Sequence, residues 1–256
     1  MTSKGKSIGL VLSGGGARGI AHLGVLKALN EFGVRPSILS GTSAGAIAAA
    51  FYANGFSIEE ILSIIKKGHF FSFSNLLFEK PGVFSMKGFE QIYAKYFPEN
   101  TFESLQIPLH VAATDLLKGQ ITYFSGGNLS QALMASSCIP VVFQPVQYNS
   151  TYYVDGGVLD NFPVEPLLGK CDIIIGSYVN SIKEELSEIH MNDVLDRSFH
   201  LALSNSVRNK IKLCNVFLEP PDMSQFGILD LKKIDAIFEY GYNYCKTQEH
   251  SLRMLL

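Results

Sequence analysis

Residues 37–53, SILSGTSAGAIAAAFYA, place a β-rich run, a glycine-flanked serine and an alanine-rich run in immediate succession. Residues 37–40 predict a buried strand, and residues 44–53 predict a helix that stops at the Asn-Gly pair 54–55. The segment between them, GTSAG, fits the pattern G-x-S-x-G. This order is typical of a nucleophile elbow, in which a sharp strand-to-helix turn lifts one serine above a sheet.

Ser43 is therefore the candidate nucleophile. It would lie at the N-terminus of the predicted helix, where the backbone dipole favours developing negative charge. The flanking glycines lack Cβ atoms, which lets the strand and the helix approach closely around a strained turn. The alternative is a chance match in a Gly- and Ala-rich turn, with Ser43 only capping the helix. The other residues of the predicted elbow are Gly41, Thr42, Ala44 and Gly45.

A second strand–turn–helix unit precedes this one. Residues 7–12 (SIGLVL) predict a strand, and apolar residues at helical spacing within 19–32 predict a helix. Two such units in succession favour a parallel sheet covered by helices, an α/β fold. With no repeat and no linker, we interpret residues 1–256 as one domain. Further strands are predicted at 109–113, 120–124, 152–154, 173–178 and 215–218, and further helices at 57–67, 86–97, 129–136, 192–208 and 231–246.

The turn of the first unit carries three successive glycines and precedes a helix. Such a loop can direct backbone N–H groups at the oxyanion of a tetrahedral intermediate. It also fits G-x-G-x-x-G, but the acid that would hold a dinucleotide ribose is absent from residues 40–42 (SGT). A P-loop is excluded because no Gly-Lys-Ser/Thr closes the run. The candidate oxyanion loop consists of Gly14, Gly15, Gly16, Ala17, Arg18 and Gly19.

Histidine is the usual base beside a serine nucleophile, but none stands in a suitable loop. In α/β-hydrolases it follows the acid in chain order. The three late histidines fall before or within a predicted helix or in the C-terminal tail, and the three early ones have no distinguishing context. These residues are His190, His200 and His250, and His22, His69 and His110.

A carboxylate is the better candidate for the base. Asp155 ends a predicted strand and precedes Gly156 and Gly157, so its loop can approach another backbone closely. By itself the sequence also fits an ordinary Asp-Gly turn. Asp160 has the same ambiguity, and the neighbouring Asn161 favours a structural turn there.

With glycine loop, serine elbow and Asp-Gly-Gly loop in this order, the chain resembles the patatin-like phospholipase family. Residues 135–140 (ASSCIP) and 143–145 (FQP) are similar to that family's block between nucleophile and acid. The resemblance implies a three-layer α/β/α sandwich with a mostly parallel central sheet. It also implies that Ser43 is the nucleophile, Asp155 the proton acceptor and residues 14–19 the oxyanion hole.

The implied activity is a serine hydrolase that cleaves lipid acyl esters through a Ser–Asp dyad and an acyl-enzyme. A free aspartate has a pKa of about 3.9, too acidic for an effective base, so Asp155 needs a dry, apolar setting. Tyr152, Tyr153, Val158 and Phe162 are candidate walls. Two alternatives stay open: an acyltransferase that uses the same acyl-enzyme, and a non-catalytic lipid-binding or regulatory protein.

Composition adds little about partners. The formal net charge of −2 gives no reason to expect nucleic acid as a partner. The four cysteines stand far apart without metal-ligand spacing, which favours reduced thiols, and we expect no metal and no cofactor. Without a signal-peptide pattern or a long apolar run, we expect a cytoplasmic protein; transient contact with a membrane surface and the oligomeric state stay open.

The segment 69–84, HFFSFSNLLFEKPGVF, is rich in phenylalanine and has no helical or strand period. It fits a lid or acyl-chain channel that opens at a lipid surface. It fits equally well an irregular segment packed onto the core.

Overall fold

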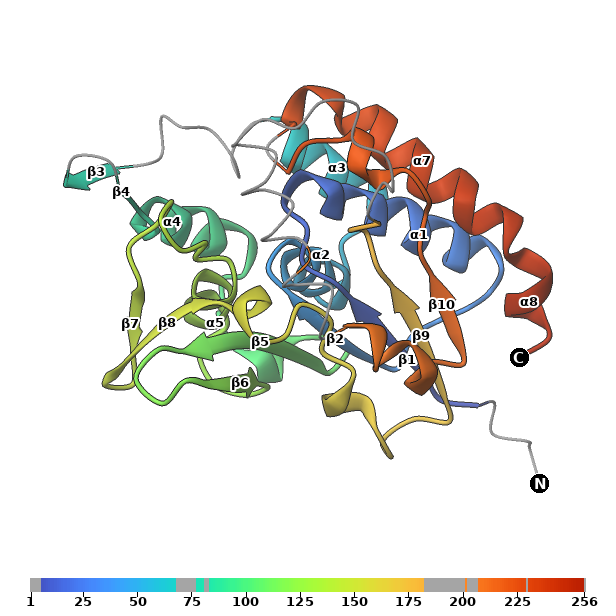
Figure 1. The fold of residues 1–256 in the computed structure, drawn as a ribbon, viewed down its shortest axis with the longest axis horizontal. Helices are drawn as coiled ribbons and strands as arrows, with labels where there is room; N and C mark the ends of the chain where they lie inside the picture. Colours follow the sequence, from blue (N-terminus) through green and yellow to red (C-terminus); the bar gives the residue numbers. More distant parts are fainter. Residues whose placement is uncertain are drawn as a thin grey trace.

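The computed structural model describes residues 6–67, 77–80, 83–181, 201, 207–228 and 230–255. Its centre is an eight-stranded sheet (Figure 1). The strands are β1 (Ile8–Leu12), β2 (Ile38–Thr42), β5 (Leu109–Asp115), β6 (Gln120–Phe124), β7 (Val146–Tyr148), β8 (Thr151–Asp155), β9 (Ile173–Ser177) and β10 (Val216–Leu218). Their order is β10-β9-β1-β2-β5-β8-β7, with β6 also paired to β5.

The strands from β10 to β5 run parallel, whereas β6, β7 and β8 add antiparallel pairs at the other end of the sheet. The predicted α/β class with a mostly parallel sheet is therefore confirmed. The parallel strands β1, β2 and β5 are almost wholly buried, as expected for strands covered on both faces.

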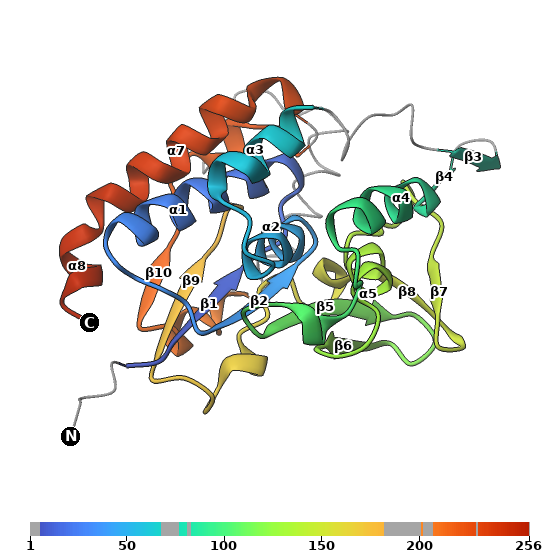
Figure 2. The same ribbon diagram turned by 180° about the vertical axis from the view of Figure 1, so that it is seen from behind.

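Helices cover one face of the sheet in two tiers (Figures 1 and 2). α1 and α2 pack on the parallel strands, α7 lies along the outside of α1, and α4 and α5 flank the antiparallel end. The helices are α1 (Ile20–Glu31), α2 (Ala44–Ala53), α3 (Ile58–Lys66), α4 (Lys87–Tyr96), α5 (Leu129–Ser136), α7 (Ile234–Thr247) and α8 (Glu249–Arg253). On the other face, the described residues bury a smaller cluster that includes Phe162, Val164 and Leu167.

Several elements differ from the predicted ones. β2 continues two residues beyond the predicted run 37–40, because the pairing with β5 extends to Thr42. The short strand β7, helix α8 and the hairpin of β3 (Leu77–Lys80) and β4 (Val83–Ser85) were not predicted. Most of the predicted helix 192–208 lies outside the described residues.

Candidate active site

The sheet brings the ends of β2 and β8 together. Val111 and Ala112 of β5 pair with both β2 and β6, so these two strands lie on opposite edges of β5. The next residues of β5, from Ala113 onward, pair with β6 and β8, so β8 lies on the same edge as β2. β8 runs in the opposite direction to β2. The two strands therefore meet end to end, and Ser43 and Asp155 stand at the meeting point.

Ser43 occupies a strained turn between β2 and α2. Its φ of 53° and ψ of −123° lie in a region that residues other than glycine rarely adopt. A Cβ atom at Gly45 would lie 2.4 Å from the carbonyl oxygens of Leu12 and Ser13, so only glycine permits this close crossing. The backbone N–H of Ser43 donates to Ser136 Oγ over 2.8 Å. The elbow predicted from the sequence is present.

Asp155 is buried, and its carboxylate lies within reach of the Ser43 hydroxyl. Its Oδ1 atom accepts from the Gly157 N–H at 2.8 Å. Burial raises the pKa of Asp155 to about 6, and the hydrogen bonds from Ser43 and Gly157 offset part of that rise. The structure thus places beside the serine a carboxylate of unusually high proton affinity. The catalytic roles of both residues stay predictions.

A cavity of 60 Å³ opens above this pair, and its apolar walls are Ile139, Pro140, Val158 and Ile228. Of the four walls expected from the sequence, only Val158 lines it. Tyr152 is exposed, whereas Tyr153 and Phe162 point into separate clusters of the core. Successive side chains along β8 point to opposite faces of the sheet, so a position next to Asp155 in the sequence was a poor guide to contact with its carboxylate.

The glycine loop follows β1 and lines the same cavity through Gly15 and Gly16. Three of its N–H groups are used within the protein: those of Gly14, Ala17 and Arg18 donate to Asn161 O, Ile228 O and Gly15 O. In the part of the chain that is described, the N–H groups of Gly15 and Gly16 have no acceptor. The Arg18 side chain donates to Phe226 O and is buried. Gly15 and Gly16 therefore line the cavity with N–H groups that have no acceptor among the described residues; the oxyanion role of the loop stays a prediction.

Two asparagines that the sequence analysis did not assign to the site also line the cavity. Asn180 follows β9 and donates from Nδ2 to Gly14 O at 2.6 Å. Asn161 is buried, and its Nδ2 has no hydrogen-bond partner among the described residues. The position of Asn180 was predictable in principle, because carboxyl ends of neighbouring parallel strands meet at one edge of the sheet.

His22 supports the glycine loop through Ser13, the residue that precedes it. It is fully buried on α1, where Nε2 lies 2.9 Å from Ser13 O and Nδ1 lies 2.8 Å from Ser177 Oγ. A neutral ring with the proton on Nε2 satisfies both contacts, since it donates to the carbonyl and accepts from the hydroxyl. Burial lowers the pKa of His22 to about 4, and the contact with Ser13 offsets part of that shift. The lowered pKa keeps the ring neutral. His22 therefore ties the ends of β1 and β9 together.

Replacing His22 with alanine should destabilise the fold, because it leaves Ser13 O and the Ser177 hydroxyl buried without partners. Each unsatisfied group costs about 1–3 kcal/mol, so urea unfolding should show a loss of roughly 2–6 kcal/mol. His250, which is exposed on α8, provides the matched control, and its alanine variant should stay within about 0.5 kcal/mol of the wild type. Equal effects of the two substitutions would contradict the bracing role.

Asp160, which the sequence left between a functional and a structural role, belongs to a charged network behind the acid loop. Its Oδ1 lies 2.6 Å from Lys210 Nζ, and its Oδ2 accepts from Tyr123 OH at 2.6 Å. Lys210 also contacts Glu165 Oε2 at 2.7 Å. The Asp160 carbonyl accepts from Thr42 Oγ1, so the network joins the acid loop to the elbow.

We expect Lys210→Met to cost about 3–5 kcal/mol of stability, since it leaves the Asp160 carboxylate buried without a cation. Adding Asp160→Asn should recover part of that loss, because the stranded charge is removed. The control is Lys66→Met, which breaks an exposed ion pair with Asp235 and should cost at most about 1 kcal/mol. Chemical denaturation of these three variants and the wild type measures the losses. A loss as small as that of Lys66→Met would show that the network does not stabilise the loop.

The remaining predictions fall on other parts of the chain. His110 Nε2 lies 3.2 Å from Lys170 Nζ and does not line the cavity at Ser43 and Asp155, whereas His69, His190 and His200 lie outside the described residues. Most of the phenylalanine-rich segment 69–84 also lies outside them. Within the described ranges, no group of His, Cys, Asp and Glu could hold a metal ion. The helices described here include none with the length and hydropathy needed to cross a membrane.

Comparison with known proteins gives one consistent family. The family model for patatin-like phospholipases matches residues 10–168. Lysophospholipase nte1 from Aspergillus niger is 27% identical over 97% of this chain. An uncharacterised NTE family protein from Mycobacterium tuberculosis is 29% identical over 93% of this chain. The chain spans only 18% of the fungal relative and 45% of the mycobacterial one.

The fold is similar to that of VipD from Legionella pneumophila, with a TM-score of 0.59 and 17% sequence identity. The match covers 96% of this chain and 67% of VipD. At this identity the likeness concerns the fold alone.

Proposed function

Because this chain belongs to the patatin-like phospholipase family, we propose that it hydrolyses acyl esters of lipids with Ser43 as the nucleophile and Asp155 as the base. The observation that carries the proposal is the contact of a strained serine with a buried carboxylate whose pKa is raised to about 6. A nucleophile and its base within hydrogen-bond reach are the minimum machinery of acyl transfer.

In the proposed reaction, Asp155 accepts the hydroxyl proton as Ser43 Oγ attacks the ester carbonyl. The oxyanion that forms is stabilised by the N–H groups of Gly15 and Gly16, which line the cavity and have no acceptor among the described residues. Collapse of the intermediate releases the alcohol, which takes the proton from Asp155, and leaves the acyl group on Ser43. A water molecule then gives a proton to Asp155 as its oxygen attacks the acyl carbonyl. The bond to Ser43 Oγ breaks, Ser43 takes that proton back from Asp155, and the fatty acid leaves.

The Asn161 side-chain amide suits a further contact with the ester. Its Nδ2 is buried at the cavity wall and has no partner among the described residues, so an oxygen of the bound substrate would satisfy it. A buried donor that is satisfied only when substrate binds favours the bound state.

Lysophospholipids are the substrate class to test first, since the fungal relative is named a lysophospholipase. Mass spectrometry should detect fatty acid released from lysophosphatidylcholine, with diacyl phospholipid and triacylglycerol in parallel reactions. An alcohol acceptor in a further reaction separates hydrolysis from acyl transfer. A fluorophosphonate probe should label the protein, and peptide mapping should place the adduct on Ser43. Absence of both label and product would rule out the proposal.

A further inference from the structure

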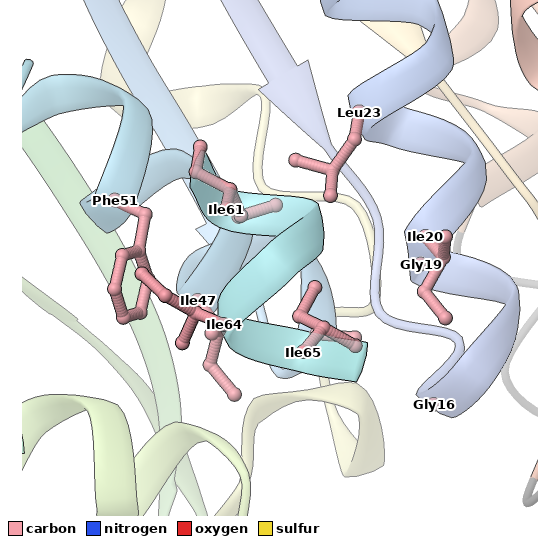
Figure 3. A pocket seen from close by; sticks show the side chains of 11 residues that line it. Gly16, Gly19, Ile20, Leu23, Ile47, Phe51, Ile61, Ile64 and Ile65 are labelled. Atoms are coloured by element: carbon pink, nitrogen blue, oxygen red, sulfur yellow. The ribbon is translucent and has the colours of Figure 1, made fainter. Parts of the chain in front are cut away.

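A second cavity lies between α1, α2 and α3, and its walls are entirely apolar (Figure 3). Ile61 and Ile64 of α3 face Ile47 and Phe51 of α2 across it, and Leu23 of α1 closes a third side. A water molecule would find no polar side chain here, so the cavity suits an apolar occupant. None of its side chains takes part in the proposed chemistry.

This cavity borders the catalytic one. Gly16 lines both, and Ala44, which lines the apolar cavity, directly follows Ser43. A group bound covalently to Ser43, with its oxygen at Gly16, therefore lies at the boundary of the two cavities, where Gly19 packs closely on Ala44 and must move aside for a chain to pass. From there the cavity continues along α2 as far as Phe51.

We propose that the cavity between α1, α2 and α3 binds the acyl chain of the substrate, and that its far wall sets the chain length. This inference rests on the proposed hydrolase function. Ala44 and Phe51 are seven residues apart on α2, about 10 Å along the helix axis. That distance corresponds to about eight C–C bonds of an extended chain, because each bond of about 1.5 Å advances the zigzag chain by only about 1.25 Å.

The present volume of the cavity, 30 Å³, is smaller than such a chain requires. An engineered core cavity needs about 150 Å³ to hold benzene. Entry of a chain thus demands that the isoleucine side chains of α3 change rotamer. The size of these side chains then determines how long an acyl chain fits into the cavity, so α3 is an element to vary.

The test compares kcat/KM for p-nitrophenyl acetate and p-nitrophenyl octanoate in each variant. Ala48→Leu adds bulk to the cavity and should lower the octanoate-to-acetate ratio by about tenfold or more, since one methylene of misfit in an apolar pocket has an effect of this size. Ile64→Ala enlarges the cavity and should raise the ratio by about threefold or more. The ratio is independent of the active fraction, so partial misfolding of a variant does not distort it.

Leu62→Ala is the matched control, because Leu62 lies on α3 and packs on the core but does not line the cavity. It should leave the ratio unchanged. Ratios that shift in opposite directions for the two lining variants, with an unchanged control, support the acyl site. Unchanged ratios in an active enzyme overturn it and leave the hydrolase function intact. A wild type that cleaves neither ester and resists fluorophosphonate labelling overturns both.

Discussion

Ser43→Ala is expected to lower ester hydrolysis by at least about 10⁴-fold, and Asp155→Asn by a similar factor. The serine variant lacks the attacking oxygen. The asparagine variant keeps the shape of the carboxyl group but cannot accept the proton of the Ser43 hydroxyl. The two side chains lie beside each other and act in one step of the proposed reaction, so the double variant should be hardly worse than either single variant.

The measurement is release of fatty acid from lysophosphatidylcholine under single-turnover and steady-state conditions. Exposed residues of the same types supply the controls: Ser63→Ala on α3 and Asp172→Asn before β9 should keep full activity. Additive losses in the double variant would mean that Ser43 and Asp155 act independently. Full activity of Ser43→Ala would place the nucleophile elsewhere.

The elbow was predictable because its chemistry is local. Residues 37–53 contain the G-x-S-x-G segment, the strand before it and the helix after it. Gly45 is itself a sign of the close contact between this turn and the end of β1, because no larger residue fits there. The partnership with Asp155 was not local. It depends on β8 meeting β2 along one edge of β5, and no periodicity within 152–154 reveals that geometry. The family resemblance supplied what the residues alone left open.

The sequence pattern does not reveal the structural role of His22. On an amphipathic helix a histidine among apolar positions suggests a solvent-facing side chain. α1, however, is covered on its outer side by α7, so its polar position is buried as well. The N–H groups of Gly15 and Gly16, which have no acceptor among the described residues, could not be identified from the sequence either. The neighbouring N–H groups donate to Asn161 O and Ile228 O, and these two acceptors come from distant parts of the chain.

The activity of the wild type should fall about tenfold per pH unit below pH 6. Asp155 acts as a base only when it is ionised, and its pKa is raised from 3.8 to about 6. A p-nitrophenyl ester does not titrate in this range, so the acid limb of kcat/KM reports the free enzyme. His22, with its pKa lowered to about 4, should not contribute to this limb. An acid limb centred near pH 4 would contradict the raised pKa of Asp155.

The same shift predicts that Asp155→Asn stabilises the protein while it abolishes activity. A carboxyl group whose pKa rises on folding favours the folded state below its unfolded pKa of 3.8, and this contribution is lost as the pH rises through about 6. At pH 8 the buried carboxylate therefore lowers the free energy of unfolding by roughly 3 kcal/mol, and the asparagine variant does not carry this cost. Urea unfolding should show the variant more stable at pH 8, with the difference shrinking between pH 6 and pH 4. A variant less stable than the wild type at pH 8 would mean that the hydrogen bonds from Ser43 and Gly157 outweigh the cost of burial, and that Asp155 is held there for structure.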